Sequence, residues 1–127
     1  MAGSASNYLE NKLIDHSLGT TTFTKPTTVY AALYTVAPSD SSAGTEVTGG
    51  SYARQAITFS AASSGSTSNN TNVDFNTMPA VTVVSVAVLD ASTAGNMLYH
   101  GTLTTNRTVL AGDSIRIASG ALVISLD

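Results

Sequence analysis

The chain has 127 residues, a net charge of −3, no cysteine and only 10% charged side chains, although 43% of it is hydrophobic. Without cysteine it can form neither disulfides nor thiolate metal sites, and its few scattered cations do not cluster as nucleic-acid binding requires. The longest apolar stretch, Val81–Leu89, is about half of a membrane-spanning helix. We expect one domain, 1–127, with no cofactor, no nucleic acid and no membrane as partner.

The N-terminal part predicts a short polar arm, 1–6, followed by a helix over 7–18. Ser6 suits the N-cap position and Gly19 suits a helix stop. The apolar face of this helix consists of Leu9, Leu13 and Ile14. A single short helix is marginal alone, so this face must dock, either on the chain's own sheet, which the residues favour, or on a neighbouring subunit.

The two clearest strands are predicted over 29–36 and 81–89. Both faces of the first are apolar, so we expect it to be covered on both sides. In the second, simple alternation places Val83, Ala87 and Leu89 on one face and Val86 and Val88 on the other.

Shorter strands complete the pattern, and they are expected over 52–60, 73–75, 97–103, 114–118 and 121–126. The last two resemble a closing hairpin across Ser119 and Gly120. About seven strands separated by turn signals predict an all-β fold, an antiparallel β-sandwich with one short N-terminal helix. The low-complexity segment 61–72 cannot order itself, so a neighbour or a sheet edge must hold it.

Catalytic and metal-binding patterns are weak in this chain. His100 has no accompanying nucleophile motif, which favours a structural or inter-subunit histidine. Residues 90–96 and 40–46 lack the acidic ligands of a calcium loop and are expected to be turns in which aspartate accepts backbone hydrogen bonds. Two arginines within strands, Arg54 and Arg116, are expected to form structural ion pairs with Asp74, Asp90 or Asp113. No catalytic residue, cofactor site or metal site is therefore predicted.

Three segments together resemble a family of small virion proteins of tailed bacteriophages. They are the N-terminal SNYLENKLIDH followed by VYAALYT, the central GTEVTGGSYARQAI, and GNMLYHG with the closing AGDSIRIASGALVISLD. The pattern spans nearly the whole chain in order. Related sequences carry an aromatic residue shortly before the central strand, where this chain has Met78, Pro79 and Ala80. The resemblance implies a capsid decoration (cement) protein or a tail-fibre-like protein, and it implies no catalytic residues.

The preferred hypothesis is a non-enzymatic cement protein at the capsid surface. It would act as a homotrimer that binds the major capsid protein and stabilises the assembled shell by mass action. The alternative is a tail-fibre or tail-tip component that binds tail proteins and touches the host surface through 61–72. A surface poor in lysine and glutamate favours self-association in either case. The predicted interface residues are Leu9, Leu13, Ile14, Tyr30, Tyr34, Tyr52 and Arg54, because aromatic residues and arginine are the usual interface anchors.

Overall fold

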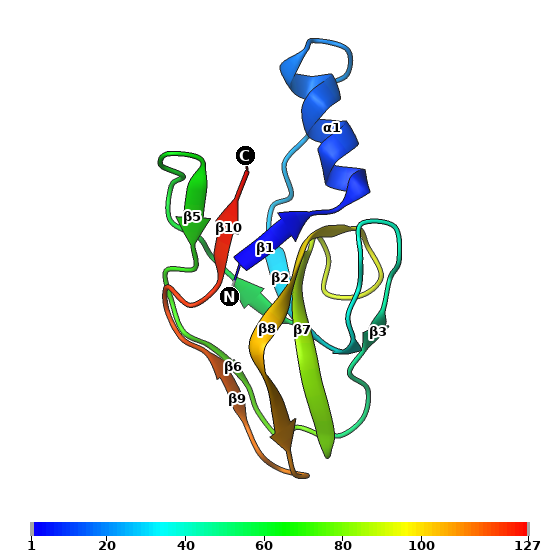
Figure 1. Ribbon diagram of the computed structural model, residues 1–127, viewed down its shortest axis with the longest axis vertical. Helices are drawn as coiled ribbons and strands as arrows, with labels where there is room; N and C mark the ends of the chain where they lie inside the picture. The colour runs from blue at the N-terminus through cyan, green and yellow to red at the C-terminus, as the bar shows by residue number, and fades with distance from the viewer. Residues whose placement is uncertain (1, 127) are drawn as a thin grey trace.

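The computed structural model describes residues 2–126 and shows a β-rich fold with a single helix over that range (Figure 1). The elements, in chain order, are β1 (Ala2–Ala5), α1 (Asn7–Ser17), β2 (Val29–Val36), β3 (Thr45–Glu46), β4 (Gln55–Ile57), β5 (Ser66–Ser68), β6 (Val73–Phe75), β7 (Val81–Leu89), β8 (Met97–Val109), β9 (Ile115–Ile117) and β10 (Val123–Ser125). None of the helices in the described residues is long and apolar enough to cross a membrane.

The strands form an eight-stranded sheet in the order β3-β2-β7-β8-β1-β10-β5, with β4 paired to β2, and a separate two-stranded ribbon, β6-β9. All pairings are antiparallel except β1 with β10. The main core gathers residues of β2, β4, β7 and β10 with those of the β6-β9 ribbon, and Phe75 is its largest fully buried side chain. The predicted all-β sandwich is confirmed, with more strands than the sequence indicated and with β8 longer than the predicted strand over 97–103.

Strand β2 is covered on both faces, as its residues predicted. Ala31 and Leu33 pack in the main core, whereas Ala32 and Tyr34 belong to a second buried cluster on the opposite face. Apolar residues on both faces stabilise a strand only when both faces are removed from water. The second cluster is the base of the cleft described below.

The alternation predicted for β7 was wrong. Val83 lies in the main core together with Val86 and Val88, while Ala87 and Leu89 face the other way. The ladder between β7 and β8 shifts register between Val83 and Ser85, and an irregularity of this kind reverses the faces of all residues beyond it. Continuous apolar composition through the bulge hides this reversal from a sequence pattern.

The N-terminal arm is a strand, since β1 lies between β8 and β10 and joins the two halves of the large sheet. Helix α1 follows at once, with the Ser6 side chain accepting the Leu9 amide as the predicted N-cap. The helix then projects beyond the strands (Figure 1). Leu9 is buried against the body, whereas Ile14 is 55% exposed. Leu13 also packs, half-buried, against the cluster that contains Leu9, so two of the three residues of the predicted apolar face dock on the chain's own sheet. The placement of Met1 lies outside the described residues.

The predicted closing hairpin was also wrong. Strand β9 pairs with β6, and β10 pairs with β5 and β1, so the two strands on either side of Gly120 do not pair with each other. The buried side chain of Asn69 links the two segments in place of a ladder, because it donates to Ala118 O and accepts from the Leu122 amide. Asn69 and β5 come from the low-complexity segment, which is thus held by a sheet edge as the sequence predicted.

Candidate binding cleft

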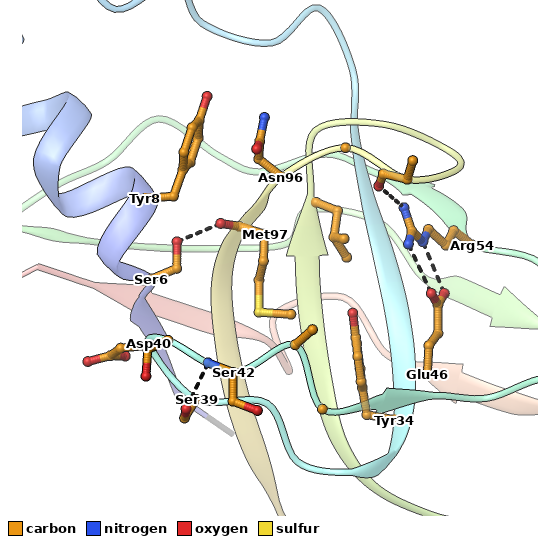
Figure 2. Close-up of a pocket in the computed structure, with 16 residues that line it drawn as sticks. Ser6, Tyr8, Tyr34, Ser39, Asp40, Ser42, Glu46, Arg54, Asn96 and Met97 are labelled. Carbon is orange, nitrogen blue, oxygen red and sulfur yellow. Dashed lines mark hydrogen bonds and ion pairs between the residues drawn. The ribbon is translucent and has the colours of Figure 1, made fainter.

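A cleft of about 460 Å³ opens on the face of the large sheet that is turned away from the main core (Figure 2). Two loops form its walls: residues 37–44, between β2 and β3, and residues 90–96, between β7 and β8. The start of α1 closes one end. We call this site the outer cleft.

The floor of the outer cleft is apolar. It is built by Tyr34 on β2, Leu89 on β7 and Met97 on β8, which belong to the second buried cluster. Small side chains at Ala32 and Ala87, both almost fully buried, let the covering groups approach the sheet closely. The floor can therefore receive an apolar surface of a bound group.

One side of the floor is held by an ion pair between β3 and the segment before β4. Arg54 binds Glu46 in a bidentate way, with Nη2 to Oε1 at 2.9 Å and Nε to Oε2 at 3.0 Å. Its Nη1 donates to the carbonyl oxygens of Ala91 and Ala94 at 2.9 and 2.8 Å. A guanidinium fork suits this geometry, and through it Arg54 ties the 90–96 loop to the sheet. The sequence prediction that Arg54 pairs with an aspartate was wrong.

Two tyrosines join this network. The Tyr52 hydroxyl donates to Glu46 Oε2 at 2.8 Å and accepts the Leu33 amide at 2.9 Å. Burial raises the pKa of Tyr52 well above its usual range, and the neighbouring Glu46 carboxylate acts in the same direction. Burial, assisted by Glu46 and opposed by Arg54, also raises the pKa of Tyr34, to about 12. Both phenols therefore stay neutral at physiological pH.

The 90–96 loop is closed by its own aspartate. Asp90 accepts the Asn96 backbone amide at 2.7 Å and the Asn96 side-chain amide at 3.1 Å. Gly95 has φ +76°, and a Cβ at that position would lie 2.5 Å from Asp90 Oδ1. The predicted turn with aspartate as acceptor is confirmed, and it presents a preformed wall to the cleft.

The 37–44 loop is anchored to the opposite side. The Asn7 amide at the start of α1 donates to Asp40 O at 3.2 Å, and the Asp40 carboxylate lies 2.8 Å from His100 Nε2 on β8. His100 thus has the structural partner that the sequence favoured. The Asp40 carboxylate contacts His100 and not the loop amides that the sequence predicted as its donors. Within the loop, the Ser39 hydroxyl accepts the Ser42 amide at 3.1 Å.

The outer cleft offers polar groups above an apolar floor. Among the described residues, no serine or threonine hydroxyl hydrogen bonds to His100, so a paired nucleophile and base is missing there. Residues 2–126 also contain no group of three histidine, aspartate or glutamate side chains placed to hold a metal ion. Hydroxyl and amide groups on the two loops, above an apolar floor, can bind a neutral polar group or a polypeptide.

The predicted interface residues fall into four environments. Leu9 and Tyr34 are buried within the chain, and Tyr52 and Arg54 form the network described above. The half-buried side chains are Leu13 and Tyr30, and Ile14 is exposed. Whether these residues contact another subunit stays a prediction. Sequence reasoning missed Glu46 and Asp40 as anchors, although each is an isolated acidic residue within a polar loop region.

Comparison with known proteins gives one family. The model of the family described as "Podophage GP4 fiber I protein gp80" matches residues 4–125. No curated protein matches the chain.

Proposed function

The chain belongs to this podophage fibre family, a family of structural proteins of the virion, and we propose that it is a self-associating building block of a tail fibre. The observation that carries this proposal is the extent of the family match, which runs from β1 to β10. It therefore includes the projecting helix, the outer cleft and both sheets. The resemblance to tailed-phage virion proteins noted in the sequence agrees with this family.

The surface of the molecule supports a role in assembly. Only 10% of the residues are charged, and interface cores are depleted in charged side chains. The C-terminal end of α1 carries an exposed apolar residue, Ile14 at 55% exposure, and the C-cap residue Leu18 is 77% exposed. A projecting helix with an uncovered apolar end gains stability when a neighbour packs on it. We propose that this end contacts a second copy, in a homo-oligomer of which a trimer is the form we favour.

The self-association proposal is tested by two matched variants on the same helix. Ile14→Glu places a charge on the exposed apolar end, whereas Asn11→Glu places the same charge on an exposed polar position. We expect sedimentation velocity to show the oligomer for the wild type and Asn11→Glu, and a smaller species for Ile14→Glu. Equal sedimentation of all three proteins would reject the helix as an interface.

The location in the virion is tested by counting and labelling. A tail-fibre component should be present in purified virions at far below one copy per major capsid subunit, measured by quantitative gel densitometry. Antibody-gold labelling in electron micrographs should mark the tail. A ratio near one to one with labelling over the shell would instead establish the capsid decoration role, in which the chain binds the major capsid protein.

A further inference from the structure

Strand β8 has an edge that is only partly paired, on the side of the sandwich where β8 and β9 line a common cavity. Strand β1 covers β8 only at Tyr99 and His100, and from Gly101 onward β8 pairs, in the described residues, with β7 alone. The register shift between Val83 and Ser85 leaves residues 103–106 without a partner in the described ladders. Unpaired backbone groups at such an edge can pair with another strand.

The strand that faces this edge is also unpaired on one side. Strand β9 pairs only with β6 among the described residues, and it follows β8 in the chain after a short connection (Figure 1). A cavity of about 290 Å³ lies between the two strands. Its apolar lining includes Leu33, Val83, Val86, Leu103, Ile115 and Ile117. We call this cavity the β8–β9 slot.

The chain itself fills the neighbouring stretch of this edge with an inserted strand. Strand β1 pairs with β8 on one side and with β10 on the other, so it lies between two strands that do not pair with each other in the described residues. The β8–β9 slot lies along the same strand, beyond the residues that β1 covers. A further strand there would bridge β8 and β9 in the way that β1 bridges β8 and β10.

The mouth of the slot has a polar, basic rim. Thr104, Thr105 and Arg107 come from β8, and Arg116 comes from β9. Arg116 binds Asp74 at 2.7 Å, whereas Arg107 is exposed and has neither an ion pair nor a side-chain hydrogen bond among the described residues. Threonine and arginine can also protect a strand edge against pairing with another chain. Such protection does not require an apolar cavity next to the edge, and this edge has one.

We infer that the β8–β9 slot accepts an extended strand from another chain of the fibre, by strand addition to the edge of β8. The incoming segment carries a branched aliphatic side chain that enters the apolar slot and an acidic side chain that faces Arg107. Backbone hydrogen bonds give such a contact its affinity, and the alternating side chains give it specificity. The inference rests on the proposed function, because the partner is a component of the assembled fibre.

Hydrogen–deuterium exchange of the purified chain and of purified virions tests the backbone contact. Amides of residues 101–109 should exchange about tenfold more slowly, or more slowly still, in virions than in the isolated chain. The exposed turn at residues 48–51 serves as the internal reference. Equal exchange at 101–109 in the two samples would overturn the inference alone. Absence of the chain from virions would overturn the proposed function, and the inference with it.

Substitutions at the slot test the same contact through assembly. Thr105→Pro removes the backbone N–H of a residue that has no partner in the described ladders, and it should reduce the copies per virion about tenfold, while Thr105→Val keeps this N–H and should assemble normally. Thermal melting of the purified variants checks that each has folded. Should Thr105→Pro fail to fold, Arg107→Glu against Arg107→Lys gives the second comparison, with loss of incorporation expected for Glu only. Normal incorporation of Arg107→Glu together with unprotected amides at 101–109 would overturn the inference.

Discussion

Two arginines of this protein form ion pairs of nearly equal length in very different surroundings. Arg54 lies 2.9 Å from Glu46, with side chains 11% and 24% exposed, and Arg116 lies 2.7 Å from Asp74, with side chains 60% and 40% exposed. The first pair also binds two loop carbonyls and a tyrosine hydroxyl. The second pair lies on the solvent-exposed face of the β6-β9 ribbon, whose opposite face packs in the main core through Phe75 and its neighbours.

The difference follows from what each region contains. The walls of the outer cleft are loops, which have no ladder of their own and so need polar anchors from side chains. The β6-β9 ribbon has a backbone ladder and an apolar inner face, so its ion pair adds little. The contribution of an ion pair to stability therefore depends less on its length than on its exposure to solvent and on the number of other polar groups that it hydrogen bonds.

Removal of Arg54 should have the largest effect. Arg54→Met leaves the Glu46 carboxylate and the carbonyls of Ala91 and Ala94 without their donor, so we expect a loss of about 3 kcal/mol in the free energy of unfolding. Urea denaturation measures this loss. Arg54→Lys keeps the positive charge but not the forked guanidinium, so its free energy of unfolding should lie between those of the wild type and Arg54→Met. A change for Arg54→Met as small as that for an exposed arginine would contradict the anchoring role.

Removal of the Tyr52 hydroxyl should have the next largest effect. Tyr52→Phe keeps the stacked ring, whose centroid lies 6.0 Å from that of Phe75, but leaves the Leu33 amide unpaired. We expect a loss of about 2 kcal/mol, because a buried donor loses the hydroxyl that accepts its hydrogen bond. Denaturation of the double variant with Arg54→Met should show non-additive losses, since both residues serve Glu46. Strict additivity would mean that the two side chains act independently.

Alkaline pH should weaken the region of the outer cleft through Tyr34. Its pKa of about 12 in the folded chain exceeds the ordinary value of 10.0, so its contribution is complete below pH 10 and is lost as the pH rises from 10 to 12. Allowing for solvent screening, the loss is about 1.5 kcal/mol. Tyr34→Phe lacks this titration, so its stability should fall less over the same interval. Parallel pH profiles for the two proteins would reject this assignment.

The sequence predicted the elements better than it predicted their pairing. Strand β2 and the N-cap of α1 follow from local patterns, apolar composition in one case and a serine before a periodic segment in the other. The faces of β7 depend on a bulge in its ladder with β8. The separation of β9 from β10 depends on Asn69, whose side chain accepts a hydrogen bond from the amide of Leu122, 53 positions further along the chain. Such contacts between distant positions leave no local pattern to read.

The candidate site was predicted only in part, for the same reason. Aromatic residues and arginine directed attention to Tyr34, Tyr52 and Arg54, which the fold does bring together around Glu46. The wall loops were recognised only as turns. The placement of the 37–44 loop depends on Asp40 and His100, which lie 60 positions apart in the chain, and that of the 90–96 loop depends on Arg54.

Removal of Arg116 should have the smallest effect. The Asp74 carboxylate beside it has a lowered pKa because of the hydrogen bond from Arg116, so any contribution of the pair is present at neutral pH and is lost as the pH falls through the lowered pKa. Because both side chains are exposed to solvent, Arg116→Met should change the urea midpoint at pH 7 by no more than the experimental scatter. A loss comparable to that of Arg54→Met would show that the ribbon depends on its outer surface.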